Sequence, residues 1–468
     1  MSATTFLSQF KQMNTKERLS IQFVDLPYYQ DLARDKFAEI EQLPWSMLLK
    51  SSDASHENSR FDILVSQPVA TVETFGAITK VMVGDEVSES DQDPFAIVND
   101  LIENLVGFRK DSTNWPFIGG AVGYFAYDLG RRVERLPIKA ENDIQAADMS
   151  IGIYDWALVV DHQEQRAAIV GSNPEFHKQW LERQVSLQEN PFTLVSNWRS
   201  NMTKQQYQDK FLSVQNYLSA GDCYQINLAQ RHQAQYTGSE WQAFNLLDNQ
   251  NQAPFSAFIR TNDSAIISVS PERFLQLHQN CIETKPIKGT RPRSVDVEQD
   301  KAYAEELKTA TKDQAENLMI VDLLRNDIGR VATPGSVKVP KLFDIESFPA
   351  VHHLVSTVTG ELAPEYCATD LLRACFPGGS ITGAPKIRAM EIIEELEPHT
   401  RSVYCGSIGY ISAHGAMDTS ITIRTLIAKQ GQIYAWAGGG IVADSECDAE
   451  YQETFDKLGR ILPTLGNL

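Results

Sequence analysis

Short apolar segments separated by polar turns are the feature that most constrains the fold of this chain of 468 residues. In the first part of the chain, residues 61–65 and 151–160 are segments of this kind. Near the other end, residues 408–411, 420–424 and 433–436 repeat the pattern. Such runs are typical of strands. Because they arrive in groups and do not alternate strictly with helices, they favour an α+β fold with mainly antiparallel sheets.

Helical spacing and one polar stretch divide the chain further. Apolar residues recur at helical spacing in residues 207–218, 311–324, 387–396 and 451–462. A polar stretch over residues 188–203 precedes the first of these helices, as expected for a linker that ends in a helix cap. The sequence therefore predicts a sheet-rich region, residues 1–190, and a mixed region, residues 200–465.

Charge and composition narrow the classes of partner. The formal net charge of -19 argues against a surface of clustered Lys and Arg, so we expect no nucleic-acid partner. No run approaches the roughly 20 apolar residues of a membrane helix, and residues 1–8 lack the pattern of a secretory leader. The 6 cysteines contain no Cys-x-x-Cys pair, which fits a reducing compartment. We therefore expect a cytoplasmic protein with no membrane partner.

Lys288 is a potential amine nucleophile, because it precedes Gly289 in a run that indicates a turn. A lysine amine attacks carbon only after it has lost its proton, which burial or neighbouring charge promotes. Glu272 directly follows the strand-like run 265–269, where a carboxyl group could face the same cleft. An acid and an amine so placed could expel a hydroxyl while a covalent bond forms. The simpler alternatives are a solvated lysine and a surface pair of Glu272 with Arg273.

Acidic residues on two predicted helices suggest a metal site. Glu316 lies on one of these helices, and Glu446, Glu450 and Glu453 recur at helical spacing near the end of the chain. Mg²⁺ takes oxygen ligands, often one or two carboxylates together with waters and an anionic substrate. Facing helices of this sort can build such a site. The alternative is a pair of solvated acidic helix faces.

Two glycine-rich segments and one arginine suggest an anion-binding site. The loop over residues 376–386 leads into a helix, but Ala384 and Pro385 replace the Lys and Ser or Thr of a nucleotide-binding loop, which excludes ATP. Residues 438–440 are glycines whose amides could approach an anion, with a tight turn as the alternative. Arg424, on a predicted apolar strand, could pair with a carboxylate or form an internal salt bridge.

Several segments, taken together, resemble the chorismate-utilising enzymes, the family that contains anthranilate synthase component I. They are Gly221-Asp-Cys-Tyr-Gln-Ile-Asn227, Ser270-Pro-Glu-Arg-Phe274, Pro286-Ile-Lys-Gly-Thr290, Val321-Asp-Leu-Leu-Arg-Asn-Asp327, Pro377-Gly-Gly-Ser-Ile-Thr-Gly-Ala-Pro-Lys386, Ile423-Arg-Thr425, Ala437-Gly-Gly-Gly-Ile441 and, in the first half, Pro44-Trp-Ser-Met-Leu-Leu49 and Ser59-Arg-Phe-Asp62. The resemblance implies two mainly antiparallel β-sheets packed as a sandwich with flanking helices. It also implies an amino-terminal region over residues 1–190 and a chorismate-binding catalytic domain over residues 200–465.

Two positions separate activities within this family. Anthranilate synthases similar to this chain carry alanine at the position of Lys288, and isochorismate and salicylate synthases carry lysine at the position of Gln225. The resemblance therefore implies that the chain aminates chorismate to 4-amino-4-deoxychorismate, a precursor of 4-aminobenzoate and folate. The alternatives are the large subunit of an anthranilate synthase and a catalytically silent regulatory subunit, although no acid, nucleophile or metal carboxylate is missing.

The family also implies roles for individual residues. Lys288 would attack C2 of chorismate while Glu272 protonates the departing C4 hydroxyl, and ammonia would then enter at C4 and displace the lysine. Mg²⁺ would be held by Glu316 and Glu453, with Glu450 nearby. Residues implied in substrate binding are Gln225, Thr290, His353, Tyr404, Arg424, Gly438, Gly439 and Gly440.

Two further partners follow from the resemblance. Tryptophan-sensing relatives read Leu-Leu-Glu-Ser where this chain has Lys50 between Leu49 and Ser51, so we expect no feedback inhibition but a bound structural tryptophan at Leu49 and Ser51. The chain lacks a Gly-x-Cys-x-Gly segment followed by His-x-Glu. We therefore expect a separate glutaminase subunit to supply ammonia.

Overall fold

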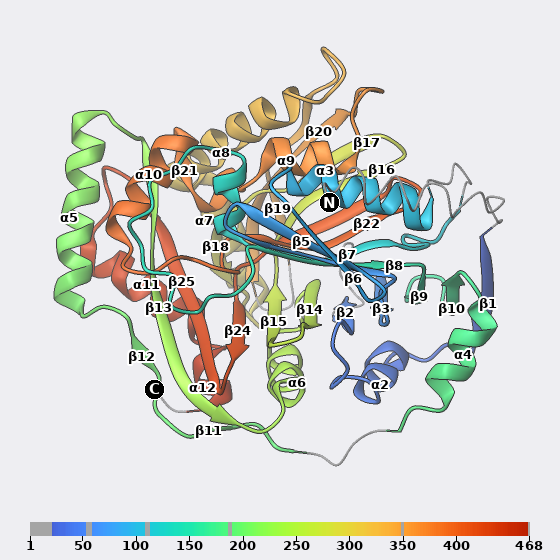
Figure 1. The fold of residues 1–468 in the computed structure, drawn as a ribbon. Helices are drawn as coiled ribbons and strands as arrows, with labels where there is room; N and C mark the ends of the chain where they lie inside the picture. Colours follow the sequence, from blue (N-terminus) through green and yellow to red (C-terminus); the bar gives the residue numbers. More distant parts are fainter. Residues whose placement is uncertain (1–20, 53–58, 108–112, 186–189, 348–350, 467–468) are drawn as a thin grey trace.

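Two large antiparallel sheets dominate the computed structural model, which describes residues 21–52, 59–107, 113–185, 190–347 and 351–466 (Figure 1). The strands of the first sheet are β1 (Gln22–Leu26), β2 (Met47–Lys50), β3 (Phe61–Val65), β9 (Trp156–Asp161), β10 (Arg166–Gly171), β11 (Thr193–Leu194), β12 (Arg199–Ser200), β13 (Gln225–Thr237), β14 (Phe255–Arg260), β15 (Ser264–Ser270), β21 (Gly383–Ala384), β24 (Thr425–Lys429) and β25 (Gln432–Ile441). Those of the second are β4 (Ala70–Phe75), β5 (Ile78–Val83), β6 (Glu86–Ser90), β7 (Gly120–Phe125), β8 (Met149–Tyr154), β16 (Arg273–His278), β17 (Cys281–Thr284), β18 (Ile287–Pro292), β19 (Lys338–Ser347), β20 (Val351–Glu361), β22 (Ser407–Ser412) and β23 (Met417–Ile421).

Helices cover both outer faces of the pair of sheets. The α-helices are α2 (Leu32–Ala38), α3 (Pro94–Leu101), α4 (Pro174–Glu182), α5 (Lys204–Ala220), α6 (Glu240–Asn251), α7 (Val297–Thr309), α8 (Thr311–Gly329), α9 (Ala368–Cys375), α10 (Lys386–Leu396), α11 (Cys447–Leu458) and α12 (Leu462–Leu465), with short turns η1 (Ile102–Val106), η2 (Tyr127–Arg132) and η3 (Gly379–Ile381). Figure 1 shows α3, α8 and α9 on the side of the second sheet and α2 and α6 on the side of the first. None of the described helices is both long and apolar enough to cross a membrane.

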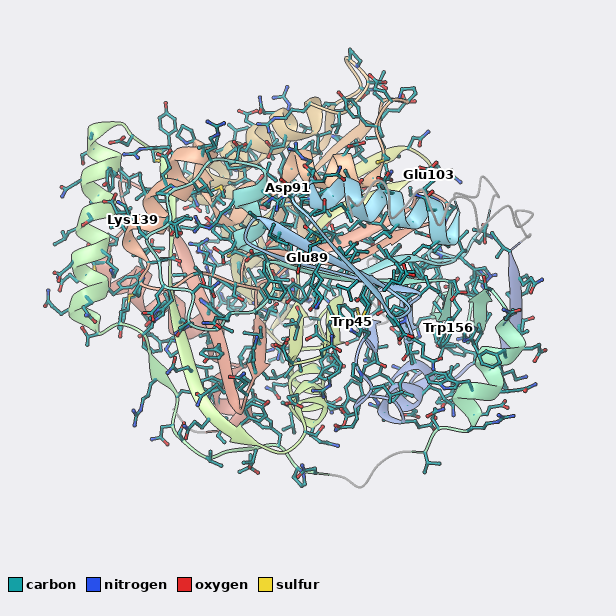
Figure 2. The ribbon with its side chains drawn as sticks, viewed as in Figure 1. Trp45, Glu89, Asp91, Glu103, Lys139 and Trp156 are labelled. Atoms are coloured by element: carbon teal, nitrogen blue, oxygen red, sulfur yellow. The ribbon has the colours of Figure 1, made fainter. Side chains whose placement is uncertain are left out.

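Alternate side chains of the first sheet enter two different cores, because successive residues of a strand point to opposite faces. On β2, Met47 belongs to the core between the sheets, whereas Leu48 belongs to a second core that α2, α6 and α12 cover. Figure 2 labels Trp45 from the first core and Trp156 from the second. This packing on two faces confirms the predicted α+β sandwich of antiparallel sheets with flanking helices.

Both halves of the sequence add strands to each sheet. In the first sheet, β2 of the amino-terminal half pairs with β14, and in the second, β7 pairs with β22. The division into residues 1–190 and 200–465 stays a prediction about the sequence, since the core between the sheets runs through both parts. Residues 1–8 and part of the predicted linker, residues 186–189, lie outside the described residues.

Three of the four predicted helices are confirmed, by α5, α8 and α10. The prediction of one helix over residues 451–462 is wrong, because α11 ends at Leu458 and α12 begins at Leu462. Pro463 explains the break. A proline has no N–H to donate, and its ring would clash with the carbonyl of Gly459 in a continuous helix.

Two runs that were predicted as single strands each contain parts of two strands, and the chain passes from one sheet to the other between them. Residues 151–160 divide at Asp155 between β8 in the second sheet and β9 in the first. The strand predicted over residues 420–424 is also wrong, because β23 ends at Ile421 and β24 begins at Thr425 in the other sheet. Arg424 lies at this corner with a positive φ of 51°. Both arms of each corner are buried strands, so the run as a whole is read as one strand and the bend is hidden.

Candidate active site

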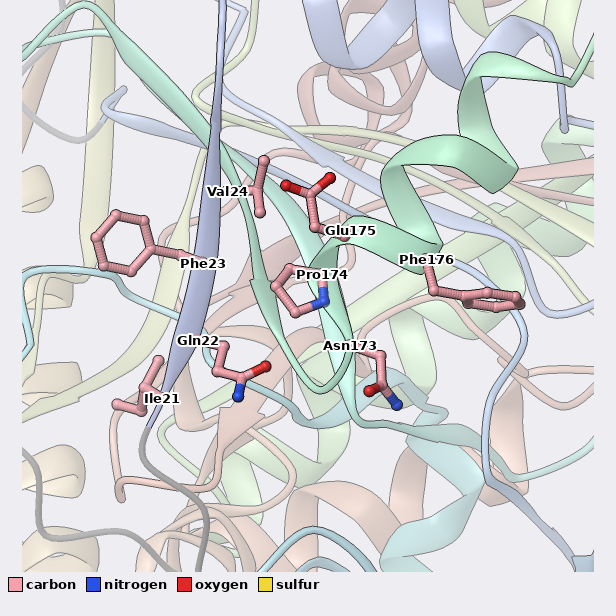
Figure 3. A pocket seen from close by; sticks show the side chains of 8 residues that line it. All are labelled: Ile21, Gln22, Phe23, Val24, Asn173, Pro174, Glu175 and Phe176. Atoms are coloured by element: carbon pink, nitrogen blue, oxygen red, sulfur yellow. The ribbon is translucent and has the colours of Figure 1, made fainter.

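A broad open hollow of about 880 Å³ lies at the edge strand β1 (Figure 3). Eight residues from β1 and from the start of α4 line it, among them Phe23 and Phe176. Glu175 is the only ionisable side chain among the eight. The hollow therefore offers no acid paired with an amine, and the chemistry predicted from the sequence belongs elsewhere.

A cavity of about 580 Å³ brings together most residues that the sequence analysis selects. The predicted residues that line it are Glu272, Lys288, Thr290, Glu316, His353, Tyr404, Arg424, Gly438, Gly439, Gly440, Glu450 and Glu453. They come from both sheets and from α8 and α11. A concave site with convergent polar groups of this kind is the usual form of an active site.

The cavity opens where the chain crosses between the sheets. Glu272 lies in the crossing from β15 to β16, and Arg424 lies in the crossing from β23 to β24. The amide of Ile421 donates a hydrogen bond to the carbonyl of Glu272 (3.0 Å), and the amide of Val269 donates one to the carbonyl of Arg424 (3.1 Å). These bonds tie the crossings together and fix an acid and a cation on the cavity wall.

Lys288 reaches the cavity from β18, and its Nζ donates a hydrogen bond to the carbonyl oxygen of Ser380 (3.2 Å). Burial lowers the pKa of Lys288, while the carboxylates of Glu316 and Glu272 act in the opposite direction. The next residue, Gly289, has a φ of 80°, and a Cβ there would lie 2.8 Å from the side chain of Asp313. The glycine therefore gives the backbone a conformation that other residues adopt only with strain. The solvated-lysine alternative does not describe this amine.

Glu272 is 7% exposed and faces the same cavity. Burial raises the pKa of Glu272, and the nearby cation of Lys288 and the polar side chain of Ser380 act in the opposite direction. The expected surface pair with Arg273 is not observed, since Arg273 binds Asp418 at 3.0 Å. A raised carboxyl pKa beside a lowered amine pKa favours a proton on the acid and a free lone pair on the amine.

Arg424 makes no ion pair within the part of the chain that the structure describes, so the alternative of an internal salt bridge is not observed there. Burial and the cation of Arg460 lower the pKa of its guanidinium. Nearby, the ring of Tyr404 stacks on that of Trp436, and the Thr290 hydroxyl lies 2.9 Å from Nδ1 of His353. A cation without a protein counterion beside polar groups is suited to bind a ligand carboxylate.

Glu450 and Glu453 project from α11 toward the glycines of β25, and Glu316 approaches from α8. A Cβ on Gly439 would lie 2.9 Å from Oε2 of Glu450 and 3.3 Å from Oε1 of Glu453, so a side chain at this position would displace the two carboxylates. These glycines lie within a strand, and the tight-turn alternative is wrong. Glu446 is the N-cap residue of α11 and does not line the cavity.

The carboxylates fit a divalent cation. Oε1 of Glu450 accepts a hydrogen bond from Ser445 (2.6 Å), but its buried Oε2 has no partner. Glu453 pairs with Lys457 at 2.6 Å. Across the described ranges, no group of three acidic, His or Cys side chains is arranged to hold a metal ion by itself. The donor set instead matches Mg²⁺, which is commonly held by one or two carboxylates together with waters and an anionic ligand.

Besides Glu446, three of the predicted residues lie outside this cavity. Gln225 is fully buried behind Gly440, and its Nε2 donates a hydrogen bond to Oδ1 of Asn227 (3.3 Å). Leu49 and Ser51 line a separate cavity of about 70 Å³ between the sheets. In the other direction, sequence reasoning missed Ser380, Asn227 and Lys457, which line the main cavity. Ser380 lies in the glycine-rich loop that was noted only for its backbone amides.

Comparison with known families agrees with this geometry. The model of the chorismate binding enzymes matches residues 46–463. The chain therefore belongs to the chorismate binding enzyme family. Within that family, it is 56% identical over 448 residues to aminodeoxychorismate synthase component 1 of Klebsiella aerogenes, covering 96% of this chain and 99% of that protein. It is 55% identical to the protein of the same name from Escherichia coli K12, with the same coverage.

The solved structures support the fold. The crystal structure of anthranilate synthase component I from Streptococcus pneumoniae superposes with a TM-score of 0.75 at 32% sequence identity, covering 86% of this chain and 92% of that one. The sandwich of two sheets predicted from the sequence is therefore the fold of anthranilate synthase component I.

Proposed function

We propose that this chain converts chorismate and ammonia to 4-amino-4-deoxychorismate. The observation that carries the proposal is the joint presence of the Lys288 amine and the Glu272 carboxyl in one cavity. The sequence of this chain is 56% identical to that of an aminodeoxychorismate synthase component 1. An anthranilate synthase large subunit is the less supported alternative, because it has no use for an amine nucleophile at Lys288.

In this mechanism, the lone pair of Lys288 Nζ attacks C2 of chorismate. Both conjugated double bonds of the ring shift by one position toward C4, and the C4 oxygen departs as water with the proton of Glu272. Ammonia then attacks C4, both double bonds return to their original positions, and the C2–N bond to Lys288 breaks. Glu272, now ionised, can accept the surplus proton. The covalent bond divides one difficult displacement into two easier ones.

The remaining residues bind and orient the substrate. Arg424 and Tyr404 lie on the cavity wall where they can hold one substrate carboxylate, and the β25 glycines leave room for a close approach. Glu316, Glu450 and Glu453 would hold Mg²⁺, which supplies positive charge for the other carboxylate and so offsets the acidity of the protein. Lys457 and Lys312 lie beside these carboxylates, at 2.6 Å from Glu453 and 3.9 Å from Glu450, respectively.

We expect Glu453→Gln to weaken Mg²⁺ binding by about tenfold or more, because it removes one of few carboxylate ligands. Calorimetric titration of the substrate-free protein with MgCl₂ measures this directly. The control is Glu446→Gln, which removes the same charge from the N-cap of the same helix, outside the cavity. This variant should bind Mg²⁺ with the affinity of the parent protein. Equal affinities for the two variants would show that Glu453 is not a ligand.

We also infer that a glutaminase subunit delivers the ammonia, as the names of the component 1 relatives suggest. The 6 free cysteines, none paired with another, support a cytoplasmic location. The isolated chain should accept ammonium salts but should release no ammonia from glutamine. Ammonia release by the isolated chain would contradict the partner proposal.

The direct test of the function is incubation of the purified chain with chorismate, MgCl₂ and an ammonium salt. Mass analysis should find 4-amino-4-deoxychorismate with its enolpyruvyl group retained. A fluorescent anthranilate product with release of pyruvate would instead establish the alternative activity. Absence of both products would refute the proposed function.

We further propose a bound tryptophan in the small cavity at Leu49 and Ser51. Support comes from the apolar side chains of Phe61 and Phe255, which line the same cavity. Lys50, which replaces the glutamate of tryptophan-sensing relatives, pairs with Asp248 at 2.9 Å. We therefore expect a structural ligand without feedback inhibition.

Acid treatment of gently purified protein should release about one tryptophan per chain, measured by chromatography. Substitution Leu49→Trp, which fills the cavity with a covalent indole, should lower that yield several-fold. A parent protein that releases no amino acid would count against the proposal.

A further inference from the structure

We propose that Asn227 is a positioning residue for the Lys288 amine, because its side chain holds the backbone carbonyl of Ser380 to which that amine donates a hydrogen bond. Asn227 lies on β13 and lines the main cavity, and Ser380 lies in η3, within the glycine-rich loop before α10. The inference rests on the proposed function and deepens it, because it adds a support for the nucleophile.

The carbonyl oxygen of Ser380 accepts hydrogen bonds from two side chains. Nζ of Lys288 donates one at 3.2 Å, and Nδ2 of Asn227 donates the other at 3.1 Å. A carbonyl oxygen has two lone pairs, so the two donors together use both of its acceptor sites. The amide of Asn227 therefore leaves one site for the amine and restricts the direction in which that site points.

A fixed acceptor matters for the chemistry of Lys288. A neutral amine attacks carbon with its lone pair, so its N–H groups must point away from the target atom. An acceptor in a fixed place holds one N–H and restricts rotation about the Cε–Nζ bond. The amine then has less entropy to lose on the way to an attacking geometry. A carbonyl that was free to turn would not give this advantage.

The amide of Asn227 is held with its nitrogen toward the loop. Nε2 of Gln225 donates a hydrogen bond to Oδ1 of Asn227 at 3.3 Å, so the amide oxygen faces Gln225 and the nitrogen faces Ser380. Gly440 is opposite Asn227 on β25, and a Cβ there would overlap Nε2 of Gln225 and lie 2.9 Å from Oδ1 of Asn227. The buried Gln225 therefore has a place in the site, one layer behind the cavity wall.

Other groups tie the loop to β13 through the backbone. The amide of Asn227 donates a hydrogen bond to the carbonyl of Thr382, and its carbonyl accepts one from Arg401, both at 2.9 Å. Arg401, which is 2% exposed, also donates to the carbonyl of Ile381 at 2.9 Å. These bonds do not involve the Asn227 side chain, so a variant at this position should keep the loop against the strand. What the side chain adds is the orientation of one carbonyl within the loop.

The test is Asn227→Ala in the full chain, with chorismate and MgCl₂. Without ammonium, the covalent Lys288 adduct followed by rapid-mixing mass analysis should form about tenfold more slowly, since misplacement of a reacting group by about 1 Å can cost about 10²-fold. With ammonium, kcat should fall by a similar factor while the KM for chorismate stays within about twofold of the parent value. Asn227→Asp keeps the acceptor for Gln225 but turns an oxygen toward the Ser380 carbonyl. It should slow adduct formation at least as much as Asn227→Ala.

Thr382→Val is the matched control, because the Thr382 hydroxyl donates to the carbonyls of Gly378 and Gly379 in the same loop, at 3.1 and 3.4 Å, and not to that of Ser380. Its adduct should form at close to the parent rate. If Thr382→Val and Asn227→Ala slow adduct formation equally, Asn227 has only a structural role in the loop. Parent-like kinetics of Asn227→Ala, or a change confined to KM, would likewise overturn the inference while leaving the function intact. A parent chain that makes no aminated product would overturn both.

Discussion

We expect the Lys288→Ala variant to form no covalent adduct with chorismate and to lose roughly 10³-fold in kcat, about 4 kcal/mol of transition-state stabilisation. The amine has no substitute in the cavity, since Lys457 pairs with Glu453 at 2.6 Å and Lys312 lies against Glu450. A slow direct amination should survive, because Glu272 can still protonate the leaving hydroxyl. Intact-mass analysis without ammonium and turnover with ammonium measure the two effects separately.

Lys285→Ala is the matched control for this variant. Lys285 lies three positions earlier in the same run, but its Nζ pairs with Glu346 at 3.2 Å and does not line the cavity. The control should form the adduct and turn over at close to the parent rate. An adduct of unchanged yield in Lys288→Ala would place the nucleophile elsewhere and remove the main support for the mechanism.

The elements of the fold follow closely from local pattern, and the two wrongly predicted strands share one physical cause. In residues 420–424, polar and apolar side chains keep alternating where the chain passes from one sheet to the other, and both arms are buried. Periodicity alone cannot show a corner when the alternation continues through it. The break before α12 is different, because Pro463 was a visible signal that the helical spacing masked.

The sequence predicts the reactive groups of the candidate site but not the backbone contacts that hold those groups in place. Side-chain type identifies Lys288, Glu272 and the acidic residues of α11 as reactive or metal-binding groups, and the family resemblance gives them roles. Ser380 was missed because its contact to the amine uses the backbone carbonyl, which every residue carries. Such a contact has no sequence signature, and only three-dimensional placement reveals it.

Arg424 shows how a wrong local prediction can still give a correct location. The residue was predicted on a strand, but it lies at a corner with positive φ. The corner moves the guanidinium out of the sheet ladder and onto the cavity wall. Its backbone carbonyl accepts a hydrogen bond from the amide of Val269, three residues before Glu272, so this contact places the anion-binding cation and the acid on one wall.

The second large effect is expected for Glu272→Gln, which keeps the shape of the side chain but removes the transferable proton. Loss of a general acid typically costs 10² to 10⁴-fold, and we expect adduct formation and overall amination to fall together by roughly that factor. Glu283→Gln is the control, because Glu283 lies on β17 and pairs with Arg273 at 3.6 Å outside the cavity. Rapid-mixing mass analysis without ammonium measures the step directly.

The pH dependence of kcat/KM should identify the same group. Burial raises the pKa of Glu272, so the acid stays protonated to a higher pH than an exposed glutamic acid, and the rate must fall as the pH rises through that pKa. Burial lowers the pKa of Lys288, so the rate must rise as that amine loses its proton. With free ammonia held constant, the profile should be bell-shaped. Glu272→Gln has no carboxyl to titrate, so its residual activity should keep the rising limb and lose the falling one; a falling limb that persists in this variant would assign the acid to another residue.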